Sequence, residues 1–88
     1  MSCYQIKISG MVQGVFFRDS AKQEAKKLGL VGYAKNLADG SVEIVACGDE
    51  EKIKEFISWC RQGPDSAKVE KTEISETPFQ NFKDFQIL

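Results

Sequence analysis

The sequence predicts an α+β fold in which an antiparallel sheet carries two helices on one of its faces. Three observations support this prediction. Residues 4–8 alternate apolar and polar side chains with the period of two that a half-buried strand requires. Residues 21–28 and 53–60 instead space their apolar side chains as amphipathic helices do. Between these stretches, Asp39-Gly40 is typical of a tight hairpin between antiparallel strands.

The first strand and the first helix are joined by a glycine-bracketed loop. Tyr4–Ile8 is expected as a strand with one buried face. A helical pattern begins after Phe17, and Gly29 is well placed to end that helix in a left-handed conformation. The apolar positions at helical spacing are Ala21, Ala25 and Leu28.

Two more strands and a second helix follow. We expect strands at Val31–Leu37 and Ser41–Cys47, connected through the Asp39-Gly40 turn. Asp49 is a suitable N-cap for the second helix, and Gly63-Pro64 would stop it. The apolar positions of this helix are Ile53, Phe56, Ile57 and Cys60.

The last part of the chain has a weaker pattern. Ala67–Ile74 places a few apolar residues among many charges, which indicates an edge strand. Thr77–Lys83 is expected as an irregular connection, and Phe85–Leu88 as a short terminal strand. The order is therefore β-α-β-β-α-β with a small extra strand, the ferredoxin-like sandwich. We expect residues 1–88 to form a single domain.

The composition is ordinary for a soluble globular protein, with 42% hydrophobic and 28% charged residues. A formal net charge of -1 gives no bias toward nucleic acid or anionic membrane. The first ten residues alternate in polarity and match neither a signal peptide nor a membrane span. We therefore expect a cytoplasmic protein with no nucleic-acid or membrane partner, and a monomer as the default for so small a chain.

The chain has no histidine, which excludes a Ser-His or Cys-His pair and the usual imidazole acid–base chemistry. Its cysteines, Cys3, Cys47 and Cys60, are odd in number and include no close C-x-x-C pair. This spacing argues against a disulfide framework and against zinc, so we expect small buried or half-buried thiols. We expect no metal and no cofactor.

The most informative stretch runs from Gly10 to Arg18, between the first strand and the first helix. Its two glycines, Gly10 and Gly14, allow successive backbone N–H groups to converge on one point, and a helix N-terminus favours an anion there. Arg18 adds a permanent charge and a planar fork that suits phosphate oxygens. This pattern predicts a cradle for a tetrahedral anion. The plainer alternative is that the glycines serve geometry alone and that Arg18 is a solvated side chain.

A second stretch, from Gly32 to Gly48, contains Asn36 near the end of a strand. The plainer interpretation is that Asn36 caps the turn before Asp39-Gly40. The sharper one is that its amide holds a water molecule in line with a bound phosphorus atom.

Together the two stretches resemble both signatures of the acylphosphatase family. The first reads Gly10-x-Val12-Gln13-Gly14-Val15-x-Phe17-Arg18; the second reads Gly32-Tyr33-Ala34-Lys35-Asn36, then Gly40-x-Val42, then Gly48. Length and element order agree with the family over almost the whole chain, although the part after Asp65 resembles it only loosely.

The resemblance implies a metal-independent hydrolase that converts acyl phosphates to a carboxylate and inorganic phosphate. It implies that the phosphoryl group is bound by Arg18 and by the backbone of a loop, and that Asn36 orients the attacking water. The loop residues are Gln13, Gly14, Val15, Phe16, Phe17 and Arg18. An acyl phosphate has a good leaving group, so positioning and charge stabilisation can supply most of the acceleration.

The sequence leaves two alternatives to hydrolysis. A non-catalytic module that senses phosphate or acyl phosphate would have the same cradle without turnover. A single-stranded RNA-binding domain shares the layout of a sheet over two helices, but Ser41–Cys47 has no aromatic residue and no RNA-binding aromatic signature is present. Similar domains also occur fused to larger enzymes that process carbamoyl phosphate; this chain is expected to be free-standing.

Other conspicuous residues are assigned to structure. We expect the aromatic side chains to pack in the core or at its rim, with Phe17 anchoring the loop from beneath. Lys35 should point to the face of its strand opposite Asn36. The remaining aromatic residues so assigned are Phe16, Tyr33, Phe56, Trp59, Phe79, Phe82 and Phe85, and the lysines Lys22, Lys26 and Lys27 are assigned to a solvated helix face.

Overall fold

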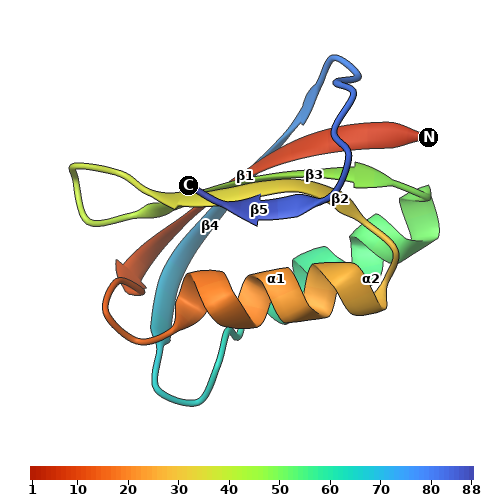
Figure 1. Cartoon of the computed structure of the whole chain (residues 1–88). Coiled ribbons are helices and arrows are strands. Elements are labelled where there is room, and N and C mark those ends of the chain that lie inside the picture. Colours follow the sequence, from red (N-terminus) through yellow and green to blue (C-terminus); the bar gives the residue numbers. More distant parts are fainter.

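The computed structural model describes all residues from Met1 to Leu88 as a five-stranded sheet with both helices packed on one face (Figure 1). The strands follow the order β4-β1-β3-β2-β5 across the sheet. The elements are β1 (Ser2–Met11), α1 (Phe17–Lys27), β2 (Val31–Asn36), β3 (Val42–Gly48), α2 (Glu50–Cys60), β4 (Lys68–Thr77) and β5 (Phe85–Ile87). This confirms the predicted ferredoxin-like arrangement and the extra terminal strand.

The sheet is antiparallel except at one edge, which corrects the prediction of a wholly antiparallel sheet. β5 pairs with β2 in parallel, in the register Gly32↔Phe85. The reason lies in the connection between β4 and β5. β4 ends at Thr77, opposite Cys3 of β1, at the end of the sheet where β2 begins. Residues 78–84 cross the sheet at that end, so β5 starts beside the start of β2 and must run in the same direction.

The core lies between the sheet and the helices. α1 contributes the buried side chains of Phe17, Ala21 and Ala25, and the two alanines leave little between the helix backbone and the sheet. α2 contributes Ile53, Phe56 and Cys60, as its spacing predicts. The other buried members of this cluster are Ile6, Ile8, Val12, Leu30, Ala34, Val42, Ile44, Ala46 and Phe85.

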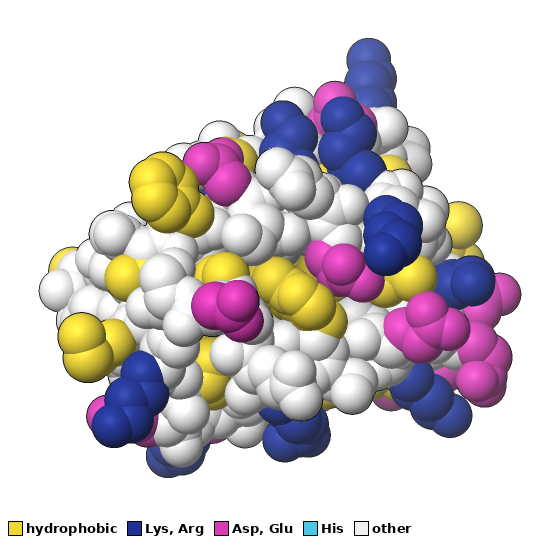
Figure 2. Space-filling view, turned by 90° about the horizontal axis from the view of Figure 1, so that it is seen from below, with side chains coloured by type: hydrophobic (Ala, Val, Ile, Leu, Met, Phe, Trp, Pro, Cys, Tyr) yellow, Lys and Arg dark blue, Asp and Glu magenta, His cyan; other side chains and the backbone are white.

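Helix ends follow the predicted chemistry. The carboxylate of Asp49 accepts a hydrogen bond from the Glu51 N–H at 2.9 Å, which caps the N-terminus of α2. α1 ends at Lys27, and Gly29 follows it with φ of 73°. Both helices have 11 residues, and neither is long and apolar enough to span a membrane. On the helical face, Lys and Arg side chains are interspersed with acidic ones (Figure 2).

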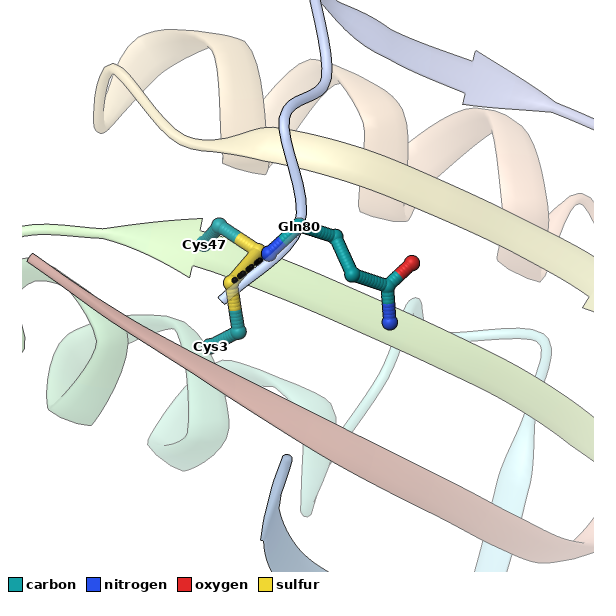
Figure 3. Close-up of a disulfide and its surroundings, with 3 residues drawn as sticks. All are labelled: Cys3, Cys47 and Gln80. Atoms are coloured by element: carbon teal, nitrogen blue, oxygen red, sulfur yellow. Dashed lines mark hydrogen bonds between the residues drawn. A yellow bond between two sulfur atoms is a disulfide. The ribbon is translucent and has the colours of Figure 1, made fainter. Parts of the chain in front are cut away.

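A disulfide joins Cys3 to Cys47 on the face of the sheet opposite the helices (Figure 3). This corrects the prediction that these two residues are thiols; Cys60 is the buried free thiol that was expected. Cys3 and Cys47 are 44 residues apart in sequence, but β1 and β3 pair them directly with their Cα atoms 4.0 Å apart. Cysteine spacing carries no information on strand register, so the sequence could not predict this bond.

The connection between β4 and β5 covers this disulfide. The Gln80 N–H donates to the sulfur of Cys3 at 3.5 Å (Figure 3). The ring of Phe82 meets that of Tyr33 edge-on, with 5.9 Å between centroids. These contacts make a second, smaller apolar cluster; its buried members are Cys3, Val45 and Cys47, with Val31, Tyr33 and Phe82 packed against them.

Candidate active site

A cavity of about 270 Å³ lies where the end of β1 turns into α1. It brings together the two stretches that the sequence singles out, because Arg18 and Asn36 both line it. Ile87 of β5 closes it from the sheet edge. Its other lining residues are Val12, Gly14, Phe16, Phe17 and Asp19.

The turn into α1 contains two left-handed residues close together. Gly14 has φ of 72°, and Phe16, the N-cap of α1, has φ of 62° and ψ of 24°. Such alternation turns neighbouring N–H groups toward one point. Phe16 has no side-chain oxygen to cap the helix, and the first intrahelical bond is from the Ser20 N–H to the Phe16 carbonyl, at 3.0 Å. The N–H groups of the first helical turn are therefore available to an anion.

Gln13 ties this turn to the neighbouring hairpin. Its amide nitrogen donates to the carbonyls of Leu37 and Ser41, at 2.8 and 2.9 Å. Ser66 holds the same turn from the other side, because its hydroxyl donates to the Val15 carbonyl at 2.9 Å. The structural role of the Gln13 side chain was not predicted, since the sequence does not reveal which carbonyls lie within its reach.

Phe17 holds the turn from the core side, as expected. Its side chain is only 1% exposed, and its ring lies 5.5 Å from that of Trp59. Gly63 leaves the space that this ring occupies, because a Cβ there would lie 2.6 Å from a ring carbon of Phe17. Phe16 and Phe79 contradict the expectation of core or rim packing, since they are 75% and 58% exposed.

The guanidinium of Arg18 is oriented by the end of the chain that follows β5. One of its nitrogens donates to the Leu88 carbonyl at 3.1 Å, and the Leu88 N–H donates to the Ala34 carbonyl of β2 at 2.9 Å. A guanidinium has five N–H donors, so one such bond fixes its direction and leaves others for an anion. This contact was not predicted, because it depends on the parallel placement of β5 beside β2.

Asn36 is the last residue of β2 and is exposed to solvent. The turn that follows is closed by Asp39, not Asn36. One carboxylate oxygen of Asp39 accepts from both the N–H and the hydroxyl of Ser41, and the other lies 3.0 Å from the Lys7 ammonium. The Ser41 hydroxyl and N–H, followed by Lys7, hold the Asp39 pKa well below its usual range. The Asn36 amide is thus not needed for the turn.

The charges at the cavity are few. Arg18 is its positive group and Asp19 its negative group. Lys35 is directed elsewhere, because its ammonium lies 3.5 Å from a Glu43 carboxylate oxygen and 5.8 Å from the centre of the Tyr33 ring. The structure contains no group of three or more His, Cys, Asp or Glu side chains that could hold a metal ion.

Comparisons with known proteins agree on one family. The family model described as Acylphosphatase matches residues 4–87. A protein named acylphosphatase from Colwellia psychrerythraea is 48% identical over 84 residues, which is 96% of this chain and 94% of that protein. The structure of an acylphosphatase from Coxiella burnetii superposes with a TM-score of 0.95 at 39% identity, covering 99% of this chain and 92% of that one. The crystal structure of acylphosphatase from Bacillus subtilis gives a TM-score of 0.97 at 36% identity, covering 100% and 99%.

Proposed function

The chain belongs to the acylphosphatase family, and we propose that Arg18 and the turn into α1 bind the phosphoryl group of its substrate while Asn36 orients the attacking water. The chain is an enzyme that hydrolyses the carboxyl–phosphate bond of acyl phosphates. The observation that carries the assignment of roles is the single cavity lined by both Arg18 and Asn36, from different elements of the fold.

The phosphoryl group is bound by what we call the 13–18 segment, residues Gln13–Arg18. Its free N–H groups and the positive end of the α1 dipole attract the phosphoryl oxygens, and glycine at position 14 lets the backbone approach them. The two-pronged guanidinium of Arg18 binds two of these oxygens. Its positive charge stabilises the negative charge on them, including the charge that shifts within the phosphoryl group during the reaction.

Asn36 acts on the nucleophile. Its amide has one acceptor and two donors, so its oxygen accepts a hydrogen bond from a water molecule and holds the water's oxygen toward phosphorus. The new bond joins this oxygen to phosphorus, the bond from phosphorus to the acyl oxygen breaks, and its electron pair leaves with the carboxylate. The proton lost by the water passes to the phosphate or the leaving carboxylate. No side chain needs to act as a base, which is consistent with a chain that has no histidine.

The test is hydrolysis of benzoyl phosphate by the purified chain in EDTA, followed by loss of the substrate's ultraviolet absorbance. Arg18→Ala and Asn36→Ala are measured in parallel, with folding checked by circular dichroism. Rapid hydrolysis that both substitutions reduce supports the assigned roles. A folded Asn36→Ala variant with near-normal turnover contradicts the role of Asn36. A wild type that binds phosphate without turnover would favour a sensing module instead.

We also propose that residues 1–88 act as one domain and as a monomer. The supporting observation is one main core, in which side chains of both helices meet those of β1, β2, β3 and β5, and against which Val69 and Ile74 of β4 pack. The partner is then the small acyl phosphate alone, without nucleic acid or membrane. Light scattering coupled to gel filtration tests this proposal, and a mass of twice 9.9 kDa contradicts it.

The cytoplasm is the location we propose, because the chain has a single disulfide and a free buried thiol, whereas small secreted domains are rich in disulfides. The Cys3–Cys47 disulfide argues in the other direction, since cytoplasmic thiols are usually kept reduced. Both sulfurs are buried, so cells are quenched in acid and the thiols are alkylated under denaturing conditions to distinguish the two. Alkylation of Cys3 and Cys47 supports the cytoplasm, and their protection as a disulfide contradicts it.

A further inference from the structure

Phe16 is placed unusually for an aromatic residue. It is the one non-glycine residue of the chain with positive φ, a conformation that L-amino acids adopt at a cost. Its side chain is 75% exposed, so burial of the ring does not offset that cost, whereas the adjacent Phe17 is 1% exposed. A strained backbone that presents an apolar ring to solvent suggests a ligand as the partner of that ring.

The ring lies at the cavity that holds Arg18. Four of the eight lining residues are apolar, and two of these, Val12 and Phe17, are buried beneath the surface as its floor. Phe16, which is exposed, and Ile87, which is half-buried, contribute the accessible apolar surface of the cavity that Arg18 also lines. Figure 2 shows exposed apolar side chains at the left end of the molecule, the end at which the turn between β1 and α1 lies in Figure 1.

The cavity has room for more than a phosphoryl group. Its volume of about 270 Å³ approaches the lower limit of roughly 300 Å³ for pockets that enclose drug-sized ligands. With the phosphoryl group at Arg18 and at the first turn of α1, the acyl group must extend across the remaining lining. Apart from Asn36 and Asp19, the side chains of that lining are apolar, and the carboxylate of Asp19 repels a second negative charge on the substrate.

We propose that Phe16, with Ile87, forms the subsite for the acyl group, and that the Phe16 ring makes the enzyme select acyl phosphates with apolar, especially aromatic, acyl groups. The proposal rests on the phosphoryl-binding role assigned to Arg18 and the 13–18 segment. It makes Phe16 a specificity-determining residue whose side chain contacts the leaving group, while its backbone belongs to the phosphoryl cradle.

The experiment compares kcat/KM for benzoyl phosphate with kcat/KM for acetyl phosphate. The quantity of interest is their ratio, because a disturbance of the phosphoryl cradle lowers both values together. Phe16→Ala keeps a Cβ in the left-handed conformation and removes only the ring. We expect the ratio to fall about tenfold, which is the scale of one lost aromatic contact. Phe16→Tyr keeps the ring and should retain the wild-type ratio within about twofold.

Phe79→Ala is the matched control. Phe79 is also an exposed phenylalanine, 58% accessible, but it lies in the connection at the far end of the sheet and does not line the cavity. Its ratio should equal that of the wild type. If the wild type is active and Phe16→Ala has the same ratio of kcat/KM for benzoyl phosphate to kcat/KM for acetyl phosphate, the proposal is overturned. Phe16 would then act only through its backbone.

Failure of the proposed function is recognised separately. A wild type that hydrolyses neither substrate contradicts the assigned roles at the reacting phosphorus. The subsite is then tested by calorimetric binding of benzoylphosphonate and acetylphosphonate, which cannot be hydrolysed. A tighter binding of the benzoyl compound that Phe16→Ala abolishes supports the subsite; equal affinities in wild type and variant overturn it.

Discussion

The two ends of the sheet are built in opposite ways. At the end where β2 begins, Cys3 and Cys47 are joined covalently, and residues 78–84 cover them with the ring of Phe82. At the other end, the turn into α1 has left-handed residues, unused N–H groups and the exposed side chains of Phe16 and Asn36. One end satisfies its groups internally, and the other leaves them for a substrate.

This difference indicates that stability and chemistry are divided between the ends. A binding site requires hydrogen-bond donors that have no partner within the protein, and often a strained backbone conformation. Both features lower the stability of the fold. A bond that closes a long stretch of chain offsets such a cost without touching the site. A substitution at one end should therefore change mainly activity, and a substitution at the other mainly stability.

Arg18→Ala should lower kcat/KM for benzoyl phosphate by about 10³-fold or more, because the guanidinium is the only positive group at the cavity. Its effect on stability should be small, since its contact with the Leu88 carbonyl is solvent-exposed. Steady-state kinetics and urea denaturation measure the two effects. Arg61→Ala, at an exposed arginine after α2, is the control and should alter neither. A loss of stability as large as the loss of activity in Arg18→Ala would remove the basis for the division.

Replacing Cys3 and Cys47 together by alanine should act in the opposite sense. Their disulfide closes a loop of 44 residues, so its removal should lower the free energy of unfolding by about 4 kcal/mol. At a temperature where the variant remains folded, kcat/KM should stay within about twofold of the wild type. Urea denaturation with and without a reducing agent provides the comparison, because the variant should not respond to the reductant. An inactive but folded double variant would show that the two ends are coupled.

Asn36→Ala should lower kcat by about 10²-fold and leave KM nearly unchanged, because the amide acts on the water and not on the phosphoryl group. Asn81→Ala is a matched control at the other asparagine of the chain. Asn81 is exposed in the connection between β4 and β5, at the end of the sheet that holds the disulfide. It should show wild-type kinetics. If Asn36→Ala instead raised KM at constant kcat, the amide would be a substrate-binding group.

The smallest expected effect is a dependence of stability on pH through Tyr33, which packs against the cluster around the disulfide. Burial, and then the hydrogen bond of 2.8 Å to Glu43 and its charge, raise the pKa of Tyr33 to about 12. The folded state therefore favours the neutral phenol. The stability that this contributes is fully present below the unfolded pKa of about 10 and is lost as the pH rises from there to about 12. Because Tyr33 is only partly buried, the total should be below about 1 kcal/mol.

Urea denaturation between pH 9 and 12 measures this effect. Tyr33→Phe should flatten the decline of the unfolding free energy over that range. The chain also contains Tyr4, so the late ionisation of Tyr33 is read from the difference in phenolate absorbance between the wild type and Tyr33→Phe. An ionisation of Tyr33 near pH 10 in the folded protein would contradict the prediction.

The sequence predicted those features that depend on neighbouring residues. Helix spacing gave α1 and α2 with their buried faces, Asp49 gave the cap, and the two glycine-containing stretches located the cavity. Features that depend on which distant segments meet were missed. The Cys3–Cys47 bond, the parallel β5 and the contribution of Ile87 all follow from strand register, which a pattern of period two does not specify. Phe16 and Phe79 were misassigned because apolarity predicts burial only on average.

The two bonds of Gln13 have a consequence for motion. Since one side chain joins the phosphoryl-binding turn to the carbonyls on both sides of the β2–β3 turn, opening of that hairpin must release the turn as well. The site should therefore fluctuate as one cooperative unit, with hydrogen exchange at the amides of Gly14, Leu37 and Gly40 slowing together when phosphate binds. Phosphate bound at the turn into α1 should therefore also reduce the motion of the end of β2, which carries Asn36 on the opposite wall of the cavity.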